Sequence, residues 1–179
     1  VKSIAIESEN VLVHMCADGH GKQFGKFFAE ETIKFMECYL LENLRHEFIS
    51  LSAKDKKIFF ENMFTKNQNY LKKSIINNLI SKGYIVDESN GYPIFTTDHS
   101  DWSSVLGGTS FSIIIVIDNK IYITNIGDSF AKLFSDKKIL SKRLLKYLGD
   151  TSLSTEKSEF KEMEKNATYG MVGSINLDI

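Results

Sequence analysis

The sequence has little proline and little cysteine: its 179 residues include one proline and two cysteines. Two thiols, Cys16 and Cys38, cannot build the disulfide framework of a small secreted protein. They favour a reducing, intracellular setting, either the cytoplasm or the nucleus. The chain starts at Val1 rather than at methionine and shows no signal-peptide pattern. We therefore expect it to begin inside a longer protein.

A strong charge of one sign and a long apolar run are missing as well. The formal net charge is −1, whereas nucleic-acid binding usually needs a basic excess or stripe, so we expect no nucleic-acid partner. The longest apolar run, Ile113 to Ile117, has the length of a strand and is too short for a membrane span. The hydrophobic fraction of 42% is typical of a globular protein. We interpret residues 1–179 as a single domain.

The first half of the chain changes from a strand pattern to a helical pattern. Apolar runs at 4–6 and 11–18 predict two strands joined by a turn. Helical spacing then predicts one helix from Gly21 to Glu47, which we expect to pack on a sheet, and a second helix that Ser52 opens and Gly83 ends. The stripe of the first helix is Phe24, Phe28, Phe35, Tyr39 and Leu44.

The second half of the chain predicts a sheet. Residues 87–106 are polar and predict a long ordered loop. Three runs of strand composition follow at 109–117, 121–125 and 130–134, separated by turn residues. They predict a three-stranded antiparallel meander. Strands, then helices, then strands again indicate an α+β layered fold.

The motif Asp18-Gly19-His20-Gly21 lies between the second strand and the first helix. The carboxylate of Asp18 suits Mg²⁺ or Mn²⁺, because these hard cations prefer oxygen ligands. Gly19 lets the backbone approach closely, so its carbonyl is a further candidate ligand. Histidine is the side chain most often used for proton transfer near neutral pH, so His20 is a candidate for that role. The same four residues are also compatible with an ordinary turn before a helix.

Two more motifs follow, and each alone is also compatible with a turn. Residues 107–110 read Gly-Gly-Thr-Ser, and residues 125–129 read Asn-Ile-Gly-Asp-Ser. In order, "CADGHGKQFGKFFAEETIKFM" and "GGTSFSIIIVIDNKIYITNIGDSFAKLF" resemble the N-terminal part of the catalytic domain of the metal-dependent serine/threonine protein phosphatases of type 2C. The resemblance covers roughly residues 11–45 and 105–135.

The resemblance implies a fold, a cofactor and a reaction. The fold would be an antiparallel β-sandwich flanked by helices, with four layers in the order α-β-β-α, of which this chain forms a partial domain. Mg²⁺ or Mn²⁺ would be bound by Asp18, which bridges two ions, by the Gly19 carbonyl, and by Asp128 near a weaker third ion. Asp18 and His20 would be catalytic, His20 as the general acid. A metal-activated hydroxide would hydrolyse phosphoserine or phosphothreonine in a phosphoprotein substrate.

The chain also departs from the family pattern. The family has a phosphate-binding Arg well before its Asp-Gly-His, but only 17 residues precede Asp18 and none is Arg. Phe130 stands where the family has another Arg, and two further metal-binding Asp residues are not reached before Ile179. We expect the chain alone to be inactive or very weak. Two functions stay open: a phosphatase completed by residues elsewhere, or an inactive pseudophosphatase that acts as a binding or regulatory module with a protein partner.

Overall fold

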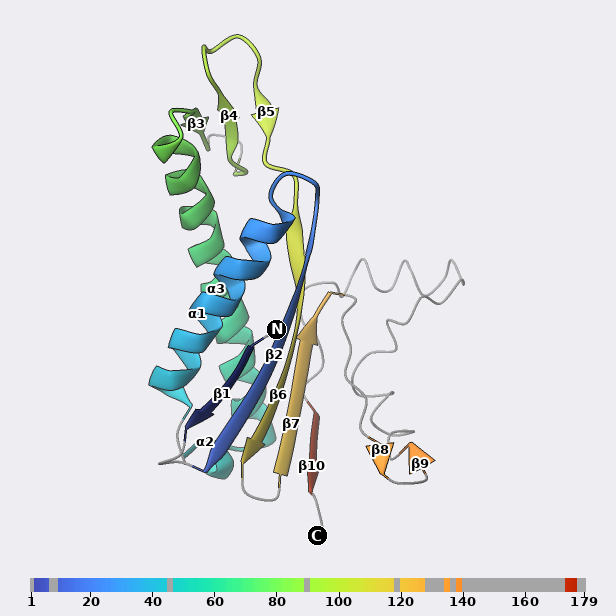
Figure 1. Cartoon of the computed structure of the whole chain (residues 1–179). Coiled ribbons are helices and arrows are strands. Elements are labelled where there is room, and N and C mark those ends of the chain that lie inside the picture. The colour runs from blue at the N-terminus through green and yellow to red at the C-terminus, as the bar shows by residue number, and fades with distance from the viewer. Residues whose placement is uncertain are drawn as a thin grey trace, which may run out of the picture.

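In a computed structural model of the chain, the residues described are 2–6, 10–44, 47–88, 91–117, 120–127, 134–135, 138–139 and 173–176. Figure 1 shows the order of the elements along the chain. They are β1 (Lys2–Ile6), β2 (Val11–His20), α1 (Gly25–Asn43), α2 (Glu47–Ser50), α3 (Ala53–Ser81), β3 (Ile85–Asp87), β4 (Ile94–Thr96), β5 (Ser103–Ser104), β6 (Gly108–Ile117), β7 (Lys120–Ile126), β8 (Phe134–Ser135), β9 (Lys138–Ile139) and β10 (Gly173–Asn176). The predicted α+β class is confirmed.

The main sheet has five strands in the order β1-β2-β6-β7-β10, and all neighbouring strands are antiparallel. Strand β6 takes the central position because it is the most apolar strand, with Ile113, Ile115 and Ile117 fully buried. Its pairing with β2 runs along the whole of both strands, from Val11 opposite Ile117 to His20 opposite Gly108. The sheet therefore aligns two segments that are far apart in the sequence.

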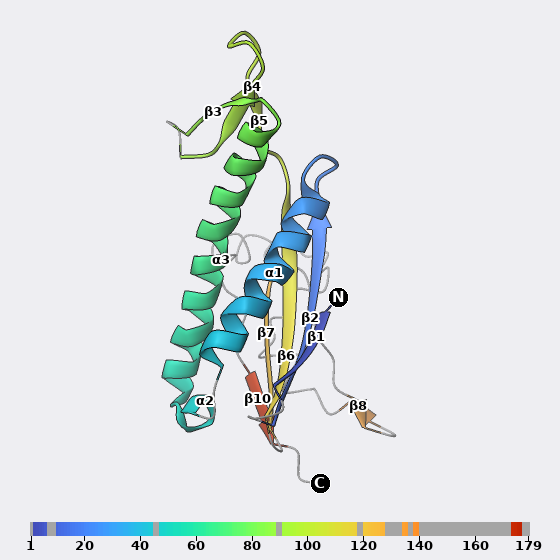
Figure 2. The same cartoon turned by 60° about the vertical axis from the view of Figure 1, so that its left-hand side comes forward.

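Helices α1 and α3 cover one face of this sheet and pack against each other (Figure 2). Every second residue of β2 points toward the helices, as the alternating burial of the strand shows. From α1, Met36 and Leu40 meet this face in a core that also contains Met63 of α3 and Phe111 of β6. Among the described residues, no helix is both long and apolar enough to cross a membrane.

The predicted stripe of α1 packs against the sheet core only in part. Phe24 and Phe28 join Ile75, Leu79 and Phe95 in a second cluster near the C-terminal end of α3. Phe35 lies beside Tyr70 of α3, with ring centroids 5.2 Å apart. The core against the sheet contains Met36, Leu40 and Leu44, and Phe35 and Tyr39 pack against it as partly buried residues. The residues that α1 buries are Gly25, Phe28, Thr32, Met36 and Leu40.

The predicted helix boundaries are partly wrong. Helix α1 is shorter than the predicted range of Gly21 to Glu47, because Gly21 has a φ of +96° and Leu44 is extended, neither of which fits a helix. The start of α3 is confirmed. The Ser52 hydroxyl accepts a hydrogen bond from the Asp55 backbone N–H over 3.1 Å, which is a standard N-cap.

Two predictions about strands are also wrong. Residues 87–106 contain strands β4 and β5, which form a small antiparallel sheet with β3. In the main sheet the outer neighbour of β7 is β10, not the run at 130–134. Residues 130–133 lie outside the described part of the chain, and Phe134 belongs to β8, which pairs with β9.

Candidate functional site

The pairing of β2 with β6 brings the first two motifs together at one end of the sheet. Asp18 lies opposite Ser110, and His20 lies opposite Gly108. Strand β2 was predicted to end at Asp18 but continues to His20. Its partner strand begins at Gly108, and the ladder between them extends to that residue. Asp18, Gly19 and His20 are therefore strand residues with a fixed register, rather than turn residues.

The side chains of Asp18 and His20 lie on the face of the sheet that points away from α1 and α3. Residues 11–16 of β2 alternate strictly between buried and exposed, and alternate residues of a strand point to opposite faces. Asp18 and His20 continue the exposed series and are both exposed. A carboxylate and an imidazole thus project from one face, two residues apart, where a ligand from solvent can reach both.

Gly19 lies on the opposite face, where the first turn of α1 packs on its backbone. A Cβ on Gly19 would lie 2.0 Å from the carbonyl oxygen of Gly25 and 3.2 Å from the Cβ of Ala29. A Cβ on Gly25 would in turn lie 2.8 Å from the His20 carbonyl oxygen. Backbone atoms cannot move aside as a side chain can. The start of α1 is therefore held against the strand end by a pair of glycines.

The second motif supports the first through two contacts. The Thr109 hydroxyl lies within hydrogen-bond distance of two carbonyl oxygens, that of Asp18 at 3.0 Å and that of Ser110 at 2.9 Å, and donates its single proton to one of them at a time. The imidazole of His20 lies directly against Gly108, where a Cβ would be 2.8 Å from Nε2. Gly108 thus leaves the space that the ring occupies, and Thr109 fixes the backbone that carries the carboxylate.

The third motif lies next to the start of β6, on the edge of that strand that faces away from β2. Gly127, which follows β7 with a φ of +81°, packs on Ser110, where a Cβ would lie 2.8 Å from the serine Cβ. Asp18, Ser110 and Gly127 therefore form a row across neighbouring strands. Asp128 lies outside the described residues, so its predicted position beside Asp18 stays a prediction.

The described residues alone do not make a complete metal site. Within that part of the chain, no group of three or more His, Cys, Asp or Glu side chains is arranged to hold a metal ion. Asp18 supplies one exposed carboxylate, and Mg²⁺ or Mn²⁺ sites usually need several oxygen ligands. A site at Asp18 would therefore have to include Asp128 and carboxylates from outside the described ranges.

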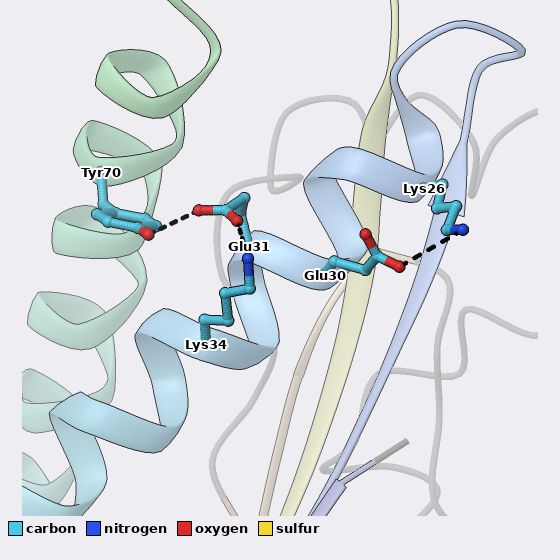
Figure 3. A network of polar contacts seen from close by, with 5 residues as sticks. All are labelled: Lys26, Glu30, Glu31, Lys34 and Tyr70. Carbon is cyan, nitrogen blue, oxygen red and sulfur yellow. Dashed lines mark hydrogen bonds and ion pairs between the residues drawn. The ribbon is translucent and has the colours of Figure 1, made fainter. Parts of the chain in front are cut away.

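A polar network ties α1 to α3 on the helical side of the sheet (Figure 3). The Glu31 carboxylate accepts hydrogen bonds from Lys34 over 2.5 Å and from the Tyr70 hydroxyl over 2.7 Å. Burial raises the pKa of Glu31, but these hydrogen bonds outweigh burial and hold the pKa below its ordinary value. Lys26 and Glu30 form a more exposed pair at 3.8 Å.

Sequence reasoning missed a cavity of about 490 Å³ between α1, α3 and the start of β6. Two of the polar residues that line it are buried, Thr32 at 0% and Asn67 at 8% exposed. The Asn67 Nδ2 donates to the Thr32 hydroxyl over 3.4 Å. A signal was present, because Asn67 stands among the apolar residues of α3 at core spacing, between Phe64 and Leu71.

No protein-family model matches the chain, and no curated protein matches it significantly. The resemblance to the type 2C phosphatases therefore stays a prediction that rests on the sequence motifs.

Proposed function

We propose that this chain carries part of the catalytic domain of a metal-dependent serine/threonine phosphatase of type 2C. The observation that supports this most is the register of β2 with β6, which places Asp18 opposite Ser110 and His20 opposite Gly108. Two motifs that are distant in the sequence meet at one sheet end, and the residue before Asp128 packs on Ser110. Residues that form one site have to lie close together, whereas three unrelated turns could lie anywhere in the fold.

The proposed fold is the four-layer sandwich of that family. Its support is the second face of the main sheet, which is apolar away from the candidate site. Leu12 is 40% exposed there, and Ile114 and Val116 are half-buried on the same face. Sheets that are apolar on both faces usually have a packing partner on each. A second antiparallel sheet against this face, covered in turn by helices on its far side, would complete the order α-β-β-α.

Each residue of the site has a proposed role. Asp18, the Gly19 carbonyl and Asp128 would help to hold Mg²⁺ or Mn²⁺, which when bound lowers the pKa of a water and neutralises phosphate charge. The exposed imidazole of His20 would donate a proton to the leaving oxygen of phosphoserine or phosphothreonine. Gly108 positions this ring by leaving space for it. The phosphorylated segment of a protein substrate would approach from the exposed face of β2.

A second candidate function is that of a pseudophosphatase, which keeps the fold and binds a regulatory partner without catalysis. The observation that favours it is Phe130, which stands where the family has Arg. An apolar ring cannot replace the paired N–H donors with which Arg binds phosphate.

The deciding assay is Mn²⁺-dependent hydrolysis of a phosphothreonine peptide by this chain and by any longer form of the protein. We expect very weak turnover from this chain and robust turnover from a longer form that supplies the remaining carboxylates. Asp18→Ala should lower the turnover of the active form at least about 100-fold, because an essential ligand is lost. Asp101→Ala, which changes an exposed loop carboxylate, is the matched control.

Each outcome of this assay separates the alternatives. Equal turnover by the wild type and Asp18→Ala would show that Asp18 is not a metal ligand. A longer form that folds and binds Mn²⁺ but does not hydrolyse the peptide would favour the pseudophosphatase.

A further inference from the structure

Leu106 is an exposed leucine next to the candidate site. The residue is 71% exposed, and it lies two positions before Gly108, on which the His20 imidazole packs. The chain passes close to the end of β2 at this point, because a Cβ on Gly21 would lie 3.0 Å from the Leu106 carbonyl oxygen. Single exposed leucines are common on protein surfaces. The position of Leu106 beside the candidate site is what gives it a candidate role.

The backbone is held in place on both sides of Leu106, in the segment that leads from β5 into β6 (Figure 1). Before it, the Val105 N–H donates to the Pro93 carbonyl oxygen over 3.3 Å, and the Val105 side chain packs against the second apolar cluster. After it, Gly107 packs on the His20 carbonyl, where a Cβ would lie 3.1 Å from the oxygen. Because both neighbours are fixed, the leucine side chain is presented to solvent at a defined place.

An extended substrate segment bound at His20 would also reach Leu106. The proposed function places the phosphorylated side chain at the His20 imidazole, which lies against Gly108. Two residues of extended chain span about 7 Å. A substrate that runs beside residues 106–108 would therefore bring the residue two positions from the phosphorylated one level with Leu106.

We propose that Leu106 determines substrate specificity, so that the site prefers phosphothreonine or phosphoserine segments with an apolar side chain two positions from the phosphorylated residue. This inference rests on the proposed phosphatase function. Its physical basis is the hydrophobic effect, because an apolar side chain that packs on the exposed leucine removes apolar surface of both partners from water. A serine at the same substrate position would bury far less apolar surface there.

The test uses three phosphothreonine peptides of equal charge: one with leucine two residues before the phosphothreonine, one with leucine two residues after it, and one with serine at both places. With an active form of the protein, we expect kcat/KM for one leucine peptide to exceed that for the serine peptide at least about fivefold. Leu106→Ser should remove this preference but not change turnover of p-nitrophenyl phosphate, which has no flanking residues. Leu106→Met, which stays apolar, should keep the preference. Ile80→Ser, at a residue of α3 that is 57% exposed, is the control and should also keep it.

A binding measurement separates this inference from the proposed function. Fluorescence polarisation of the same peptides, labelled with fluorescein, reports the preference without catalysis. A preference in binding that Leu106→Ser abolishes, with no turnover of any substrate, would support the role of Leu106 and contradict the phosphatase function. Turnover that is equal for the three peptides, or a preference that survives Leu106→Ser, would overturn the role of Leu106 and leave the phosphatase function standing. Absence of both binding and turnover would overturn both.

Discussion

The Thr109 hydroxyl can donate a hydrogen bond over 3.0 Å to the carbonyl oxygen of Asp18, although the two residues are 91 positions apart in the sequence. The bond lies where β2 reaches its exposed end, so it adds a side-chain tie to the ladder of the two strands. It fixes the backbone that carries the candidate metal ligand. Stability and site geometry are therefore coupled at this one hydroxyl group.

Removing this hydroxyl should destabilise the protein without changing its shape. We expect Thr109→Val to lower the free energy of unfolding by about 1 kcal/mol, the usual net value of one hydrogen bond. Thr109→Ser keeps the hydroxyl and should lose less. Urea unfolding followed by circular dichroism measures both variants. A Thr109→Val variant as stable as the wild type would mean that the bond contributes nothing.

Gly19→Ala should be among the most damaging small substitutions in this chain. Its methyl group would lie 2.0 Å from the Gly25 carbonyl oxygen, so α1 would have to move away from β2. We expect a loss of about 3 kcal/mol or more in the free energy of unfolding, as for other cases of severe overpacking. Thermal unfolding measures the effect.

Gly83→Ala is the control for the Gly19 variant. Gly83 has a φ of +86° but no atom near its Cβ position. We expect a loss of about 1 kcal/mol from backbone strain alone. Similar losses in the two variants would contradict the close packing of α1 on β2.

The network around Glu31 should make stability depend on pH. Hydrogen bonds lower the pKa of Glu31 in the folded protein, so the carboxylate stabilises the fold above its unfolded pKa. This contribution is lost as the pH falls through the lower, folded value. At pH 7 we expect Glu31→Gln to be less stable than the wild type by about 1 kcal/mol. The difference should shrink in acid, as urea unfolding between pH 7 and pH 3 would show.

Two further variants show which contacts cause this pH dependence. Tyr70→Phe removes the hydroxyl that donates to Glu31 over 2.7 Å and should cost about 1 kcal/mol at pH 7. Glu30→Gln removes only an exposed pair at 3.8 Å and should change stability by less than about 0.5 kcal/mol. A larger effect at Glu30 than at Glu31 would contradict the assignment.

His20 should matter most for substrates with poor leaving groups, provided that the protein is a phosphatase. In an active form, we expect His20→Ala to slow phosphothreonine hydrolysis about 100-fold, within the usual range for a general acid. Hydrolysis of p-nitrophenyl phosphate should fall much less, because its leaving group needs little protonation. His99→Ala, at an exposed loop histidine, is the control. Equal losses on both substrates would indicate that His20 does not act as the acid.

Local signals explain which elements the sequence predicted. The N-cap at Ser52 and the glycine at 83 act within one helical turn, and both marked α3 correctly. The apolar runs of β6 and β7 were likewise clear, since each strand is bounded by turn residues. Strands β4 and β5 were missed because they have three and two residues, too few for an alternation to stand out. The pairing of β7 with β10 joins distant segments, and no local pattern indicates it.

The candidate site likewise has features that the sequence predicted and features that depend on three-dimensional packing. The motif letters predicted a site at Asp18, Gly19 and His20, and its role stays a prediction. The role of Gly25 as the partner of Gly19 was not predicted, because it depends on how closely α1 crosses β2. The burial of Asn67 was not predicted. Only the three-dimensional packing shows that it lines a cavity.

The long register between β2 and β6 also determines when the candidate site can appear during folding. The β6–β7 hairpin joins strands that are neighbours in the sequence, and the contacts within α1 and within α3 join neighbouring turns of one helix. All of these contacts are local, and local contacts form early. The ends of β2 and β6 can meet only after both helices are accommodated between them, and closing so long a loop costs chain entropy first. We therefore expect Asp18 to acquire its partner strand late in folding, so that a newly made chain presents this site only when its fold is nearly complete.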